Sequence, residues 1–80
     1  MTFETLRYIY RLLEQEEEAT RLNYAKAREH LNYLLDLLEN QESDQLRQQI
    51  KEEKEHCKTL DRIHDKAFHA FNEFREHEWR

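Results

Sequence analysis

Three side chains in the second half of the sequence have the types and the spacing of metal ligands. Cys57, Asp61 and His64 follow one another by four and three residues, which places them on one face of a helix. Thiolate, carboxylate and imidazole bind zinc and related ions, and Glu53 and Glu17 carry carboxylates that can complete such a site. The competing interpretation is structural: a small buried cysteine, a solvated aspartate and a histidine hydrogen-bonded between helices. We favour the structural interpretation and expect no metal site and no cofactor.

The stretch from Glu53 to His56 also has the Glu-x-x-His spacing of helical di-iron proteins. Those proteins carry this motif on two helices together with two further carboxylates, all facing inward, whereas this sequence contains one copy. His56 lies among charged residues, so we expect it to face solvent.

Cys57 is the strongest candidate nucleophile, but its surroundings in the sequence do not support catalysis. A catalytic thiol needs a nearby base, a cleft and groups that stabilise an oxyanion. His56 directly precedes Cys57 and therefore points about 100° away around a helix. Two long helices offer no cleft of the required kind. The sequence predicts a protein that is not an enzyme.

Charged residues form two clusters with opposite signs. A basic ridge steps by three or four residues through Arg47, Lys51, Lys54, Lys58, Arg62 and Lys66. Such a ridge can follow a phosphate backbone, but interspersed acids are typical of a solvated helix face. An acidic cluster in the first half suggests mimicry of DNA phosphates, through Glu14, Glu16, Glu17 and Glu18. A nucleic-acid-linked role is the alternative function, although the net charge of -5 makes nucleic acid an unlikely partner.

The composition leaves helix as the structural outcome. Of the 80 residues 39% are charged and 38% are hydrophobic, and Gly and Pro are absent. An aromatic content of 11% argues against disorder. We expect one all-α domain over residues 1–80, a long antiparallel helical hairpin with helices at 3–39 and 44–78 and a turn at 40–43. Asn40 can adopt the left-handed conformation that ends many helices.

Both predicted helices carry an apolar seam at alternating three- and four-residue steps, as in a coiled coil. Folding the chain back at Glu42 brings the two seams together along their length. Leu38 then faces Leu46 near the turn, and Tyr10 faces Phe74 near the open end.

The first seam is interrupted by polar residues that find a counterpart in the second. Glu17 and Thr20 break the apolar pattern, and folding back at the turn places His64 opposite them. We expect these three residues to form one polar layer. Such a layer fixes the register of two helices at some cost in stability.

The first predicted helix has a second apolar row, on the side away from its seam. We expect this row to bind a partner through Tyr8, Leu12, Ala19, Leu22 and Tyr33. The equivalent side of the second helix is polar. Two hairpins packed through the row form a four-helix bundle, so we expect a homodimer. The alternative is a three-helix bundle, in which a break near residues 18–23 lets the first piece fold back over the row.

These features predict a non-enzymatic protein–protein interaction module, a small regulator or inhibitor that binds a larger protein of unknown identity through an apolar and aromatic helical face. No apolar run approaches the roughly 20 residues that cross a bilayer. The single Cys and the absence of a secretion signal at the N-terminus predict a cytoplasmic location. The sequence gives no indication of whether Trp79 packs.

Overall fold

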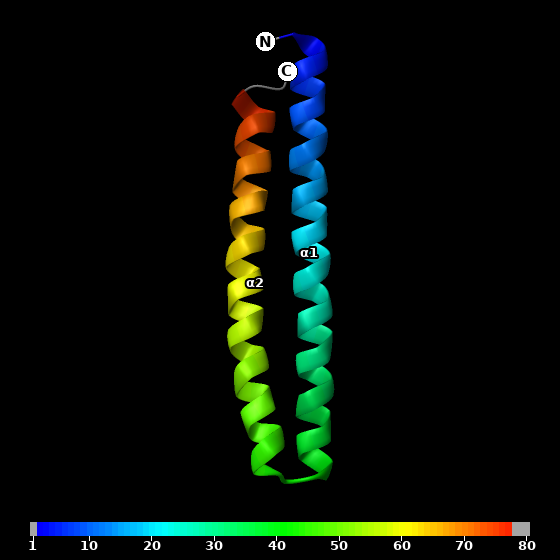
Figure 1. Ribbon diagram of the computed structural model, residues 1–80, viewed down its shortest axis with the longest axis vertical. Coiled ribbons are helices and arrows are strands. Elements are labelled where there is room, and N and C mark those ends of the chain that lie inside the picture. The colour runs from blue at the N-terminus through cyan, green and yellow to red at the C-terminus, as the bar shows by residue number, and fades with distance from the viewer. Residues whose placement is uncertain (1, 78–80) are drawn as a thin grey trace.

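The computed structural model describes residues 2–77 and contains two long helices, α1 (Phe3–Asn40) and α2 (Asp44–His77). They lie side by side and antiparallel, so the start of α1 and the end of α2 are at the same end of the molecule (Figure 1). The molecule measures 59 × 14 × 14 Å. The expected all-α hairpin is confirmed. The predicted end of the second helix at residue 78, and Trp79, lie outside the described residues.

The start of α1 is stabilised by a side-chain cap. The Thr2 hydroxyl accepts a hydrogen bond from the Thr5 N–H at 3.2 Å, and the Thr2 carbonyl accepts one from the Leu6 N–H at 3.1 Å. Glu4 lies in the first turn, where a negative charge is favourable against the helix dipole. The cap therefore supplies partners for early N–H groups that no helical carbonyl reaches.

α1 continues without interruption through its acidic segment, so the alternative of a three-helix bundle with a break near residues 18–23 is wrong. The repulsion among the acids is offset at Glu17, whose carboxylate lies 3.8 Å from the Arg21 guanidinium and 3.4 Å from the His64 ring. The segment also lacks Gly and Pro, the residues that most strongly disfavour a helix interior. Repulsion alone therefore does not break the helix.

The turn is one residue shorter than expected, and α1 ends in a different way from the one expected. Asn40 is the last residue of α1, and its side-chain amide donates to the Asp36 carbonyl at 3.2 Å. No residue of the described chain has a positive φ, so the expected left-handed ending is wrong. Gln41 leaves the helix in an extended conformation, with its N–H bonded to the Leu37 carbonyl at 2.9 Å. Ser43 then caps α2 by accepting the Leu46 N–H at 3.4 Å.

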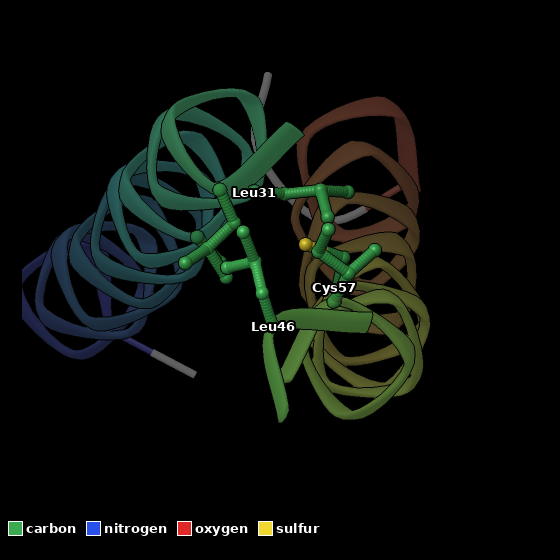
Figure 2. Close-up of a cluster of buried hydrophobic side chains, with 6 residues drawn as sticks. Leu31, Leu46 and Cys57 are labelled. Atoms are coloured by element: carbon green, nitrogen blue, oxygen red, sulfur yellow. The ribbon is translucent and has the colours of Figure 1, made fainter. Parts of the chain in front are cut away.

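The core is a single strip of apolar side chains between the helices. Near the turn it comprises Ala27, Leu31, Leu34, Leu46, Ile50 and Cys57. Figure 2 shows the labelled side chains Leu31, Leu46 and Cys57 in the space between the two helices. Toward the open end Tyr10 packs edge-on against Phe71, one turn before the expected Phe74, with ring centroids 5.2 Å apart. The strip follows the predicted seams, which confirms the fold-back at the turn.

Neither helix within the described residues combines the length and the apolarity needed to cross a lipid bilayer. The reason is the regular alternation of the apolar strip with charged residues around each helix. Each helix thus has one apolar side against its neighbour, and only α1 carries a further apolar row.

Candidate functional site: the outer face of α1

The apolar row predicted on the far side of α1 lies at the surface of the hairpin. We call it the outer row, and it comprises Tyr8, Leu12, Ala19, Leu22 and Tyr33. The exposed fractions are 64% for Tyr8, 51% for Leu22 and 59% for Tyr33. Leu12 and Ala19 are also exposed. The structure therefore brings all five residues to one solvent-facing side of a single helix, and no part of the described chain covers them.

Helix geometry explains why α2 leaves this row uncovered. The seam residues of α1 recur every three or four residues and are buried against α2, as Thr20, Ala27, Leu31 and Leu34 show. The outer row is offset from them by more than a quarter turn, so a second helix that covers the seam does not reach it. Other large exposed apolar residues lie elsewhere around the two helices and do not extend the row; they are Phe3, Leu35, Ile63 and Phe68.

The polar layer in the middle of the hairpin is confirmed in its cross-helix contact. The Glu17 carboxylate lies 3.4 Å from His64 Nε2, and both side chains are largely buried. Thr20 is also buried, but its hydroxyl donates to backbone carbonyls of its own helix, at 2.8 Å to Glu16 and 3.0 Å to Glu17. A hydroxyl satisfied in this way needs no partner on α2.

The predicted ligand candidates do not converge. Cys57 is buried in the core, Asp61 is exposed, and His64 is in contact with Glu17. Within residues 2–77 no group of three or more His, Cys, Asp or Glu side chains is arranged to hold a metal ion. The face shared by Cys57, Asp61 and His64 in sequence is divided in the structure between core and solvent.

Glu53 instead lies between two histidines. Its carboxylate is 3.3 Å from His30 Nδ1 on α1 and 3.3 Å from His56 Nδ1 on α2. Both rings remain more than half exposed, as expected for His56. Sequence reasoning missed the contact between Glu53 and His30, because it considered Glu53 only as a candidate metal ligand and did not single out His30. The signal that was available is the fold-back itself, which places His30 opposite the segment around Glu53.

The surroundings of Cys57 do not activate its thiol. Burial raises the pKa of Cys57, because removing water disfavours the charged thiolate. The negative charge of Glu53 acts in the same direction, and the Arg28 guanidinium opposes both. Since the thiolate is the nucleophilic form, the buried side chain is poorly suited to covalent catalysis.

The basic ridge is partly neutralised by neighbouring acids. Arg47 lies 2.9 Å from Glu42, and Lys58 lies 3.4 Å from Glu55. In the acidic cluster, the Glu17 side chain lies in the polar layer between the two helices. The acidic cluster therefore does not present all four of its carboxylates on one surface, as a mimic of a phosphate row requires.

Comparison with known proteins finds no matching family profile, no matching curated protein and no matching solved structure.

Proposed function

We propose that this chain is a non-enzymatic protein–protein interaction module, a small regulator or inhibitor that binds a larger protein through the outer row of α1. The observation that carries the proposal is an exposed apolar and aromatic row on a helix whose opposite side is already covered by α2. Soluble proteins rarely keep large exposed apolar patches without a binding role. The matching side of α2 is polar, so the asymmetry sets α1 apart as the binding helix.

The two tyrosines are the proposed anchors of the interface. Aromatic side chains bury a large area with few rotatable bonds, and they carry much of the binding energy in many interfaces. Tyr8 and Tyr33 lie near opposite ends of the row, and Leu22 lies between them. This spacing suits a partner that offers an apolar groove or a second helix over most of the length of α1.

The proposed location is the cytoplasm. The lone thiol of Cys57 is buried without a disulfide partner, and reducing compartments are where such thiols are usual. In the part of the chain that the structure describes, the candidate metal-ligating side chains do not converge, and the proposed mode of action is therefore the occupation of a surface of another protein.

The experiment that tests the proposed function compares two variants that add the same charge at different places. Leu22→Glu puts a carboxylate in the centre of the outer row, and Thr59→Glu puts one on the exposed side of α2. Proteins captured from a host lysate by the wild-type chain are expected to be captured by Thr59→Glu and lost with Leu22→Glu. Circular dichroism of each variant verifies that the helices remain. Equal capture by Leu22→Glu and wild type contradicts the proposal.

A further inference from the structure

The outer row is part of a longer pattern that is symmetric about its own midpoint. Steps of alternately four and three residues run through eight exposed positions of α1: Tyr8, Leu12, Gln15, Ala19, Leu22, Lys26, Glu29 and Tyr33. The midpoint of this series lies between Thr20 and Arg21. Reversing the direction of the helix about that point returns the same eight positions, because the order of the steps is unchanged by reversal.

We propose that a second copy of this chain occupies the outer row, with the two α1 helices antiparallel and related by a two-fold axis beside Thr20 and Arg21. This inference rests on the proposed function, because it names one occupant of the same surface. The result is a bundle of four helices with the two α1 helices innermost and each α2 outside.

Four of the five apolar residues of the outer row meet one another under this two-fold relation, and Leu12 meets Glu29. Tyr8 of one copy lies opposite Tyr33 of the second copy at both ends of the interface. Ala19 lies opposite Leu22 of the second copy on either side of the axis, so a small residue faces a large one, as close packing of two helices requires. Each pair occurs twice, since a two-fold interface uses the same patch on both copies.

Charge disfavours the parallel arrangement of the same two helices. In parallel packing each row residue faces its own copy, so Lys26 meets Lys26 and Glu29 meets Glu29 inside the interface. Like charges facing each other in this way are unfavourable. In the antiparallel arrangement Lys26 faces the neutral amide of Gln15, and Glu29 faces Leu12, where its methylene groups pack and its carboxylate remains at the edge.

The shape of the single hairpin gives a reason for self-association. Its radius of gyration is 17.8 Å, compared with roughly 12 Å for a compact domain of this length. Each helix has one neighbour, and even the most buried core residue among those described, Leu31, keeps 4% of its surface exposed. Covering the outer row with a second copy buries apolar area that an isolated hairpin leaves in water.

Self-association and binding of a larger protein then compete for one surface. In the dimer both outer rows are covered, so the larger protein binds the dissociated hairpin. Its apparent affinity falls as the concentration of the chain rises above the dimer dissociation constant, because the fraction of free hairpin falls.

Cross-linking through two polar positions of the row tests the orientation. In a Cys57→Ala background, Gln15→Cys and Lys26→Cys are prepared as separate single-cysteine chains and treated with a short bis-maleimide. The antiparallel dimer brings position 15 of one copy to position 26 of the other and keeps identical positions roughly 16 Å apart along the helix. Covalent dimer is expected in the mixture of the two chains and is expected to be absent with either chain alone.

The outcomes separate this inference from the proposed function. Cross-linking of each chain with itself, or a wild-type chain that light scattering shows to be monomeric, overturns the antiparallel dimer. If that monomer still loses its larger partner with Leu22→Glu, the proposed function stands alone. A cross-linked antiparallel dimer whose larger partner is retained by Leu22→Glu supports the inference and contradicts the proposed function. Thr59→Glu serves as the control and is expected to remain a dimer.

Discussion

At the scale of single residues, Cys57 gives the hairpin a dependence on alkaline pH. Its pKa is raised in the folded chain, so the unfolded chain loses the thiol proton first as the pH increases. The stability that the buried neutral thiol contributes is present below the ordinary thiol pKa and is lost as the pH rises through the raised value. Wild type is therefore expected to lose more stability than Cys57→Ala between about pH 7 and about pH 10. Denaturant unfolding at both pH values measures this difference.

Tyr and Lys residues also change their protonation at alkaline pH and affect the stability. Their effect cancels in the comparison with Cys57→Ala, because both proteins contain them. The alanine variant itself is expected to be less stable at neutral pH by about 1 kcal/mol, since it removes a buried sulfur from the core. An identical loss in both proteins at alkaline pH contradicts the raised pKa.

The contact between Glu17 and His64 specifies register at a cost in stability. Replacing a largely buried carboxylate and its hydrogen-bonding partner by apolar residues often stabilises a protein, because the desolvation penalty disappears. The double variant Glu17→Leu with His64→Leu extends the apolar strip of both helices and is expected to increase the free energy of unfolding by about 1 kcal/mol. His64→Leu alone leaves Glu17 with Arg21 as its near cation and is expected to gain less. Denaturant midpoints of wild type, His64→Leu and the double variant measure their relative stabilities. A midpoint of the double variant below that of wild type contradicts the prediction.

Contacts between residues were predictable where the position of the turn places two residues opposite each other. They were not predictable where the conformation of the side chains determines whether two groups meet. Glu17 and His64 interrupt two matching seams, so their proximity follows from the position of the turn. The fold-back places His30 opposite the segment around Glu53, but the contact itself depends on how far the ring and the carboxylate extend across the edge of the seam. The periodicity of the sequence does not encode that reach. The same limit applies to Thr20, whose hydroxyl could point across to α2 or back to its own helix with equal justification from the sequence.

At the scale of elements, Ser43 determines where α2 begins. Its hydroxyl accepts the Leu46 N–H at 3.4 Å, and its carbonyl accepts the Arg47 N–H at 3.0 Å. Ser43→Ala removes the side-chain acceptor and is expected to lower the free energy of unfolding by about 1 kcal/mol, whereas Ser43→Asp keeps an acceptor and most of the stability. Gln45→Ala, at an exposed neighbouring position, is the control. Equal denaturant midpoints for Ser43→Ala and wild type contradict this role of the cap.

Both helices were predictable from composition and periodicity, because the sequence contains no Gly or Pro and its apolar residues recur at helical spacing. The ends were less predictable. Asn40 permits a left-handed ending, but its side chain instead bonds back to Asp36, and the chain leaves the helix one residue later in an extended conformation. The break near residues 18–23 was suggested by repulsion among acids, which the contacts of Glu17 with Arg21 and His64 offset.

At the scale of the whole molecule, the outer row was predictable and its partner was not. The spacing of Tyr8, Leu22 and Tyr33 identifies one side of a helix, and the structure leaves that side exposed. The partner that covers the outer row is selected by the fit between two surfaces. The sequence of this chain describes both surfaces only when the partner is another copy of the chain. The proposed pairing of two copies is such a case, because the symmetry of the eight positions relates the outer row to itself.

The proposed self-association predicts that unfolding of the protein depends on its concentration. Melting of a dimer releases two chains, so mass action raises the thermal midpoint as the protein concentration increases. Wild type and Thr59→Glu are expected to show this increase in circular dichroism melts recorded over a range of concentrations. Leu22→Glu places a charge in the interface, and it is expected to melt at a lower temperature that does not change with concentration. A wild-type midpoint that is independent of concentration shows that the hairpin is stable alone, and that the outer row does not hold a second copy.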